Sequence, residues 1–207
     1  MLHKSIIAIL PIKKISKRLP NKNFKMFHGK QLYEWALEAC LTSKLIDETY
    51  ISCSEDIKES RAKWIRRPET LNGDVELMEV MKHALETIGK EGDVFIQVQV
   101  NKPLIKSEQI DKFIQTFQDQ KLNTLFQVQK INQSINWKYK SNRNDGKFNF
   151  KSCALAKIWD YETLKNAKIG TWGFGDKHLN YIVGNHHIEI DTQEDWDIAM
   201  ALKRAGF

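Results

Sequence analysis

The chain has 207 residues, of which 42% are hydrophobic and 28% are charged, so we expect one globular domain over residues 1–207. No segment approaches the ~20 apolar residues that span a bilayer, which argues against a membrane protein. The three cysteines lack the paired spacing of a metal site, which favours reduced thiols in a cytoplasmic protein. The formal net charge of +6 favours an anionic partner, either a nucleotide, a nucleic acid or an acidic sugar.

The chain begins with a short apolar run, Ile6–Leu10, which is bounded by Pro11. A run of this length, rich in β-branched residues, predicts a strand that is buried on both faces. Five cations follow it: Lys13, Lys14, Lys17, Arg18 and Lys22. An open α/β sheet binds its ligands at the carboxyl ends of its strands, and cations suit a polyphosphate there. A solvated basic loop is the alternative, but the position directly after the first strand favours a nucleotide site.

Strands and helices alternate along most of the remaining chain. The expected helices are Leu32–Cys40, Val75–Ile88, a helix from Ser107, Tyr161–Ala167 and Gln193–Ala205. The expected strands are Glu48–Ser52, Val94–Val100 with Gln97 and Gln99 on one face, Leu125–Gln129, Ala154–Ile158 and Ile188–Asp191. This alternation predicts an α/β fold with a mainly parallel sheet and helices on both faces.

A polar and aromatic segment over residues 130–152 interrupts the alternation. It contains the turn sequence Asn142-Arg143-Asn144-Asp145-Gly146 between two strand-like pieces, which predicts a small hairpin extension. This hairpin is the best candidate in the sequence for a subdomain or a homodimer contact.

Two carboxylates, Glu189 and Asp191, lie two residues apart on the last expected strand and therefore on one face of it. Carboxylates at a strand end can hold Mg²⁺ together with substrate phosphates. The alternative is that Thr192 or Asp191 caps the following helix, as Thr and Asp do well. The neighbouring histidines, His186 and His187, would point to opposite faces of a strand, so they are not expected to share a metal ion.

A nucleic-acid surface is a further alternative for a basic chain with 6 tryptophans. The tryptophans are scattered, several at helix-core positions, and the sequence carries no signature of an RNA-binding module. We therefore expect no nucleic-acid partner.

Several motifs resemble a known family when they are taken in chain order. After Ile-Ala-Ile-Leu-Pro come Ser16-Lys17-Arg18-Leu19-Pro20-Asn21-Lys22-Asn23, Gly29-Lys30-Gln31-Leu32, Arg67-Pro68-Glu69-Thr70-Leu71-Asn72-Gly73-Asp74, Gln99-Val100-Asn101-Lys102-Pro103-Leu104 and Ile188-Glu189-Ile190-Asp191-Thr192-Gln193-Glu194-Asp195. This series resembles the sugar-activating cytidylyltransferases, which include the CMP-sialic acid synthetases and the 3-deoxy-manno-octulosonate cytidylyltransferases. The motifs span nearly the whole chain.

The resemblance implies a three-layer α/β/α nucleotidyltransferase fold, Mg²⁺, and attack by a hydroxyl of an acidic sugar on the α-phosphorus of CTP. It implies that Lys22 neutralises the triphosphate, Lys13 lies beside the α-phosphate, and Asp191 holds the metal with Glu189 beside it. The nucleotide-binding positions it implies are Leu10, Pro11, Ser16, Lys17, Asn23, Arg67 (near the cytosine) and Asp74. Gln99 and Asn101 would contact the sugar.

The chain departs from the family pattern at several positions. Lys14 and Ile15 replace glycines of the first loop, and Lys13 cannot offer the bidentate fork of an arginine. Asn101-Lys102 stands where the octulosonate enzymes carry Asp-Glu, so the chain resembles a divergent member closer to the sialic type. The alternatives are a nucleotidyltransferase for another sugar or a phosphorylated acceptor, or a homologue that binds nucleotide or sugar with impaired catalysis.

Overall fold

The computed structural model describes residues 4–13, 16–57, 61–73, 75–130, 150–171, 173–183 and 188–207. Most of the expected hairpin (131–149) lies outside the described residues, as do Asp74, the Lys14-Ile15 pair and the His186-His187 pair. Within the described part, no helix is both long and apolar enough to cross a membrane.

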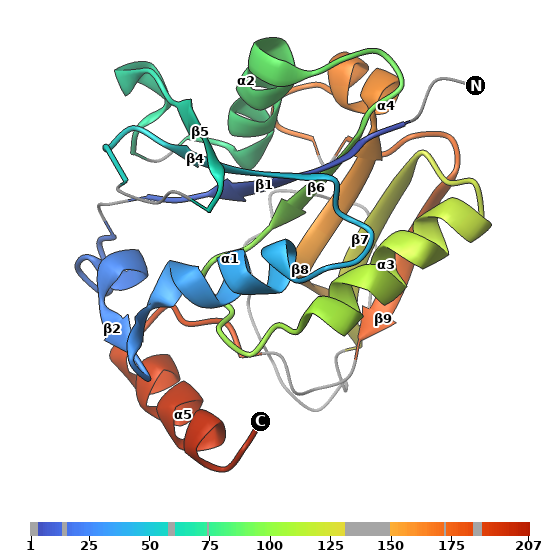
Figure 1. Cartoon of the computed structure of the whole chain (residues 1–207). Helices are drawn as coiled ribbons and strands as arrows, with labels where there is room; N and C mark the ends of the chain where they lie inside the picture. Colours follow the sequence, from blue (N-terminus) through green and yellow to red (C-terminus); the bar gives the residue numbers. More distant parts are fainter. Residues whose placement is uncertain are drawn as a thin grey trace.

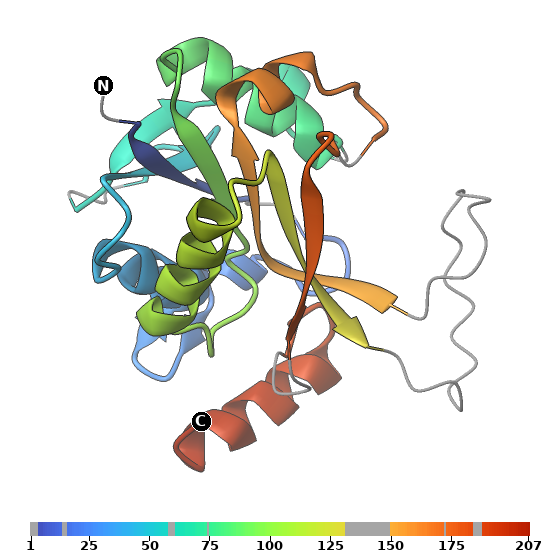
Figure 2. The same cartoon turned by 90° about the vertical axis from the view of Figure 1, so that its right-hand side faces the viewer.

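Seven strands form one sheet in the order β5-β4-β1-β6-β8-β7-β9. Its strands are β1 (Ile6–Pro11), β4 (Glu48–Cys53), β5 (Lys63–Arg66), β6 (Val94–Val98), β7 (Thr124–Lys130), β8 (Phe150–Asp160) and β9 (His178–Val183). Only β8 runs antiparallel to its neighbours among these strands, so the expected mainly parallel sheet is confirmed. Figure 2 shows β7, β8 and β9 side by side.

Helices cover both faces of the sheet, which confirms the three-layer α/β/α arrangement. The described helices are η1 (Lys22–Phe24), α1 (Leu32–Leu41), η2 (Glu69–Leu71), α2 (Leu77–Ile88), α3 (Ser107–Asp119), α4 (Tyr161–Asn166) and α5 (Gln193–Arg204). In Figure 1, α2 and α4 lie above the sheet, whereas α1 and α3 lie below it.

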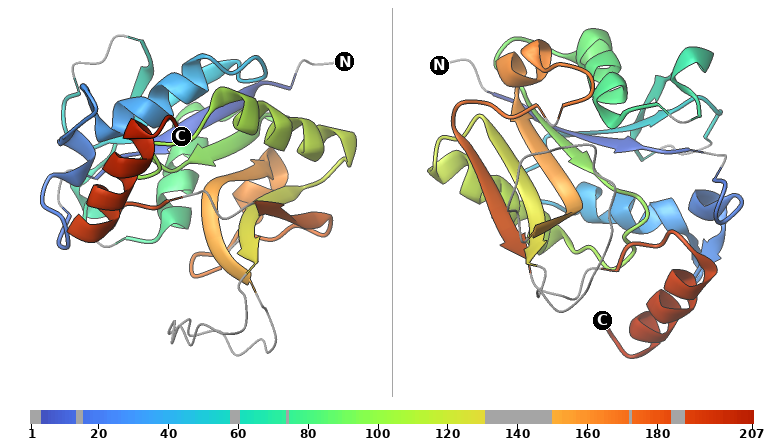
Figure 3. Two further views of the ribbon diagram at one scale, coloured as in Figure 1. Left: turned by 90° about the horizontal axis from the view of Figure 1, so that it is seen from below. Right: turned by 180° about the vertical axis from the view of Figure 1, so that it is seen from behind.

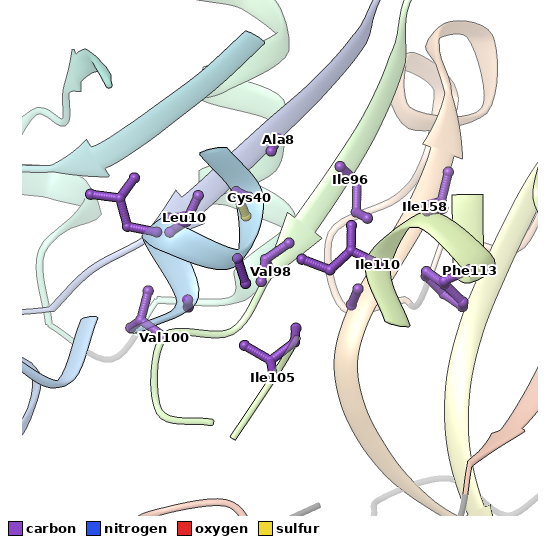
Figure 4. Close-up of a cluster of buried hydrophobic side chains, with 14 of the residues drawn as sticks. Ala8, Leu10, Cys40, Ile96, Val98, Val100, Ile105, Ile110, Phe113 and Ile158 are labelled. Atoms are coloured by element: carbon purple, nitrogen blue, oxygen red, sulfur yellow. The ribbon is translucent and has the colours of Figure 1, made fainter. Parts of the chain in front are cut away.

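The first strand lies inside the sheet, between β4 and β6, and is buried on both faces, as expected. Ile7 and Ile9 pack in the cluster under α2 and α4, whereas Ala8 and Leu10 pack in the cluster against α1 and α3. Figure 4 shows Ala8 and Leu10 in the second of these clusters. Side chains alternate between the two faces along a strand, which explains this division. Pro11, two residues after Ile9, therefore lies on the same face as Ile9, toward α2.

Two edge strands were not expected from the sequence. In β5 only Ile65 is buried, while Lys63, Trp64 and Arg66 are exposed, so the strand lacks a strong apolar pattern. The strand β9, over His178–Val183, pairs in parallel with β7 and mixes polar and apolar residues. Edge strands bury less than central ones and tolerate such sequences.

The expectation of a last strand over Ile188–Asp191 is wrong. These residues form an extended segment without strand pairing, and the N–H of Ile190 donates to the carbonyl oxygen of Asn101 at 2.9 Å. Asn101 lies beyond the end of β6, so the segment crosses the carboxyl edge of the sheet and does not run alongside a strand. The side chain of Ile190 is fully buried.

The closing helix α5 packs against the first loop. The strands β2 (Met26–Phe27) and β3 (Lys30–Gln31) form a hairpin whose two turn residues, His28 and Gly29, both have positive φ, as such tight turns require. Trp196 of α5 meets Phe27 edge to face, with ring centroids 5.3 Å apart. Figures 1 and 3 show α5 beside this hairpin, so a segment near the start of the chain packs against the last helix.

Candidate active site

A cavity of about 620 Å³ opens at the carboxyl ends of β1 and β6, beside the start of α2. This is the place where open α/β sheets bind their ligands. The residues expected from the sequence that line it are Pro11, Lys13, Ser16, Lys17, Lys22, Asn23, Arg67, Gln99, Asn101, Glu189 and Asp191. Leu10 does not line it, because its side chain faces the opposite layer and is fully buried in the apolar core.

Arg18, one of the cations expected at the nucleotide site, also lines the cavity. Six further lining residues were not expected: Gly73, Val75, Leu77, Val80, Gln97 and Val100. Gln97 shares a strand face with Gln99, so the sequence carried a signal for it. The apolar residues at the start of α2 reach the cavity only through the packing of that helix on the sheet.

The lining is strongly cationic. Lys13, Lys17, Arg18, Lys22 and Arg67 contribute five positive charges, whereas Glu189 and Asp191 contribute two negative ones. Such an excess of positive charge in one concave site attracts a polyanion.

An ion-pair network joins the basic loop to the segment before α5. Nζ of Lys22 lies 2.8 Å from Oδ1 of Asp191, and the Arg18 guanidinium lies 2.8 Å from Oδ2. The Lys22 ammonium also donates to the carbonyl oxygen of Ile190. The Lys22 side chain is 9% exposed and that of Arg18 67%, so Lys22 is the anchored partner and Arg18 the one that exchanges readily with solvent.

The cap of α5 adjoins this network through the backbone of Asp191. Thr192 is the N-cap: its hydroxyl oxygen accepts from the N–H of Asp195 at 3.2 Å, and the Asp195 carboxylate accepts from the N–H of Thr192 at 2.8 Å. Of the two residues considered as the cap, Thr192 therefore has that role, and Asp191 does not. The Asp195 carboxylate also accepts from the N–H of Asp191 at 3.0 Å. Burial acts to raise the pKa of Asp195, but these hydrogen bonds outweigh it and hold the pKa below its usual range.

Thr192→Ala should lower the free energy of unfolding by ~1 kcal/mol, the usual cost of losing a threonine cap. Chemical denaturation measures this loss, and the affinity of the cavity for a polyanion should stay unchanged because Thr192 does not line it. Folding lowers the pKa of Asp195. Its contribution to the free energy of unfolding is therefore complete above the unfolded pKa of ~3.9 and is lost as the pH falls through the folded pKa. A large loss of affinity for a polyanion in Thr192→Ala would show that the cap also positions the cavity residues.

Glu189 meets a second buried cation. Its carboxylate lies 3.6 Å from Nζ of Lys102, a side chain that is only 1% exposed, and it accepts from the amide of Asn101 at 3.3 Å. In the sequence, the Asn101-Lys102 pair is only a departure from the family pattern. In the structure, the same pair holds Glu189 at the cavity wall. Sequence alone could not show this contact, because the two segments are 88 positions apart.

Four buried polar atoms at the cavity have no hydrogen-bond partner among the described residues. They are Oδ1 of Asn23, Nε of Arg67, Oε1 of Gln97 and Oε1 of Gln99. Buried polar atoms are normally paired, so a group of orphans that lines one cavity points to a polar ligand.

Two of the residues that carry these atoms are held by the loop after β1. The amide nitrogen of Asn23 donates to the carbonyl oxygen of Lys13 at 2.7 Å, and the Arg67 guanidinium donates to the carbonyl oxygen of Ile12. Arg67 is 3% exposed, and burial lowers the pKa of its guanidinium, although Cys53 nearby acts to raise it. Both side chains therefore stabilise the loop and face the cavity.

Comparisons with known proteins agree with this geometry. A family model described as "Cytidylyltransferase" matches residues 7–202. An N-acylneuraminate cytidylyltransferase from Escherichia coli O18:K1:H7 is 33% identical over 119 residues, covering 55% of this chain and 28% of that protein. A pseudaminic acid cytidylyltransferase from Campylobacter jejuni is 27% identical over 124 residues, covering 53% of each. The chain therefore spans about half or less of the length of these curated relatives.

A solved structure of a CMP:2-keto-3-deoxy-manno-octonic acid synthetase in complex with CTP shares the fold. The TM-score is 0.72 at 13% identity, and the match covers 99% of this chain and 100% of the other. At that identity the likeness concerns the fold alone.

Proposed function

Because the chain belongs to the cytidylyltransferase family, we propose that it transfers CMP from CTP to an acidic sugar and releases pyrophosphate. The observation that carries the proposal is the ion pair of Lys22 with Asp191, which joins the basic loop and the acidic segment in one cationic cavity at the ends of β1 and β6. In the reaction a hydroxyl oxygen of the sugar bonds to the α-phosphorus, the bond from that phosphorus to pyrophosphate breaks, pyrophosphate takes the bonding electrons, and the hydroxyl proton passes to solvent. Positioning and charge neutralisation are most of what such a transfer needs.

We assign the triphosphate to the basic loop. Lys13, Lys17 and Lys22 would neutralise its charge, and Ser16 would donate to a phosphate oxygen, since charge-assisted hydrogen bonds to phosphate are among the strongest available. The unpartnered Oδ1 of Asn23 suits a donor such as a ribose hydroxyl. The buried Arg67, with its Nε unpartnered, would lie on the nucleoside side together with the Pro11 end of β1.

Mg²⁺ would be held by Asp191 and Glu189. Both carboxylates line the cavity, with side chains 28% and 32% exposed, and both accept hydrogen bonds or ion pairs. Among the described residues no group of three His, Cys, Asp or Glu side chains is placed to hold a metal ion. The donors present therefore fit an ion that takes most of its ligands from phosphate and water, as Mg²⁺ does. Bound there, it would supply charge neutralisation at the phosphates.

The acceptor would lie toward β8, where Gln99 and Asn101 face the cavity. The relatives described above are named for N-acylneuraminate and pseudaminic acid, and the matching structure for an octonic acid.

Pyrophosphate release with CTP and a panel of acidic sugars tests the proposal directly. We expect release that depends on both substrates and appears with at least one acidic sugar. Pyrophosphate release with a phosphorylated alcohol, but with none of the acidic sugars, would identify a different acceptor class. CTP binding without any pyrophosphate release would identify a homologue with impaired catalysis.

Base selectivity gives a second, cheaper test. A site that hydrogen-bonds one base should reject the others, so CTP should raise the melting temperature more than UTP, ATP or GTP does. At a CTP concentration one hundred times Kd the stabilisation should be ~2.7 kcal/mol. Equal shifts with all four nucleotides would leave only a general phosphate site and would contradict the proposed CTP dependence.

A further inference from the structure

One face of β6 contributes first to the apolar core and then, further along the chain, to the lining of the cavity. Phe95, Gln97 and Gln99 follow one another at every second residue, so their side chains share a face of the sheet. Phe95 is fully buried in the apolar cluster under α2. Gln97 and Gln99 line the cavity, and Gln97 is only 2% exposed.

The Oε1 atom of Gln97 has no hydrogen-bond partner within the described part of the chain. Its neighbour across the sheet in β1 is Ile9, which is fully buried in the same apolar layer as Phe95. An apolar side chain at position 97 would suit that layer better, because a buried acceptor that lacks a donor destabilises the fold. The glutamine therefore has a role that folding does not explain.

A second buried glutamine shows the contrast. Gln127 of β7 is 3% exposed, and its Oε1 accepts a hydrogen bond from the N–H of Ala156 at 3.2 Å. Gln127 does not line the cavity. Its amide is satisfied by the protein, as buried amides normally are, whereas the Gln97 oxygen is left for a ligand.

The order of strands indicates which part of the ligand meets Gln97. The residues assigned to the nucleotide follow β1 and β5, on the side of the sheet where the order is β5-β4-β1. Gln97 lies on β6, whose other neighbour is β8 with Lys157 opposite. The acceptor sugar is therefore the part of the ligand pair nearest to Gln97.

We propose that Gln97 is a specificity-determining residue whose Oε1 accepts a hydrogen bond from a hydroxyl or amide N–H of the acceptor sugar. The inference rests on the proposed transfer to an acidic sugar. Side chains two residues apart on a strand are separated by ~6–7 Å, so Gln97 and Gln99 offer two acceptors across roughly the width of one sugar ring. The acceptor class is thus a sugar acid with donors at two separated positions, and a small phosphorylated alcohol does not meet this requirement.

The test compares Gln97→Met with the matched control Gln127→Met. Gln97→Met should keep or raise the melting temperature, because it removes an unsatisfied buried acceptor, and should leave the shift induced by CTP unchanged. The KM for the acidic sugar that the wild type uses should rise about tenfold, the effect of one lost hydrogen bond. Gln127→Met should lower the melting temperature and leave that KM unchanged.

Acceptor analogues that each lack one hydroxyl or acylamido group locate the contact. One analogue should be used about tenfold less well by the wild type but not by Gln97→Met, because the bond is already absent in the variant. A wild-type KM in Gln97→Met, or a loss of stability equal to that of Gln127→Met, would overturn the inference while the proposed function stands. A wild type that transfers CMP to no acidic sugar would overturn both.

Discussion

Replacing Lys22 by methionine is expected to weaken CTP binding by roughly 1–3 kcal/mol, the loss that follows removal of a charged hydrogen-bond partner. The side chain of Lys22 is 9% exposed, so its ammonium is held at the cavity wall and loses little conformational freedom when a phosphate binds. Methionine keeps most of the volume of the side chain and removes only the charge and its hydrogen bonds. Isothermal titration calorimetry with CTP measures the effect.

The same substitution should also lower the free energy of unfolding. Without Lys22, Asp191 keeps the exposed Arg18 as its cationic partner among the described residues, and the carbonyl oxygen of Ile190 keeps only the longer hydrogen bond from the amide of Asn101, at 3.5 Å. The matched control is Lys25→Met: Lys25 is exposed, lies over the Trp196 ring at 4.5 Å and does not line the cavity, so CTP affinity should not change. Wild-type CTP affinity in folded Lys22→Met would remove Lys22 from the nucleotide site.

The first strand and the position of the site could be predicted because their signals are local. The apolar run Ile6–Leu10 requires burial on both faces, which places it inside the sheet and not at an edge. The basic residues that follow it must then lie at a carboxyl edge, and Lys13, Lys17 and Lys22 do line the cavity there. Composition along a few residues was enough for these steps.

The extended segment before α5 was harder to predict. Its alternating pattern Ile188-Glu189-Ile190-Asp191 is that of a strand, yet the structure has no strand there, because the segment crosses the end of β6 and bonds to Asn101. Glu189 and Asp191 still reach the cavity, because the side chain of Ile190 between them is buried in the core and theirs point to the opposite side of the segment.

The partners of the site residues could not be predicted from one sequence. Lys22 and Asp191 are 169 positions apart, and nothing in either segment indicates the other. The Asn101-Lys102 pair stands where the octulosonate enzymes carry Asp-Glu, and nothing in the sequence indicates that the buried ammonium of Lys102 lies beside Glu189. Such pairings follow from tertiary packing, which here depends on α5 docking on the first loop.

Asp191→Asn is expected to reduce CMP transfer by roughly 10²–10³-fold, the loss typical when one electrostatic group of a preorganised site is removed. Asparagine preserves the size of the side chain and one acceptor oxygen for Lys22. The cap of α5 stays intact because Thr192 and Asp195 provide it. The fold should therefore survive, and the loss should concern the reaction and its Mg²⁺ dependence.

Titration of Mg²⁺ against CTP binding in the wild type and in Asp191→Asn separates a metal ligand from a carboxylate that only orients Lys22. If Asp191 holds the ion, the variant should need a higher Mg²⁺ concentration for the same CTP affinity, because Mg²⁺ then keeps only Glu189 and the phosphates as anionic ligands. Asp197→Asn is the matched control: Asp197 lies on α5, accepts from Gln193 at 2.8 Å and does not line the cavity, so its Mg²⁺ dependence should equal that of the wild type. An unchanged Mg²⁺ dependence in Asp191→Asn, with transfer lost, would assign Asp191 to the positioning of Lys22 and would leave Glu189 as the carboxylate to test next.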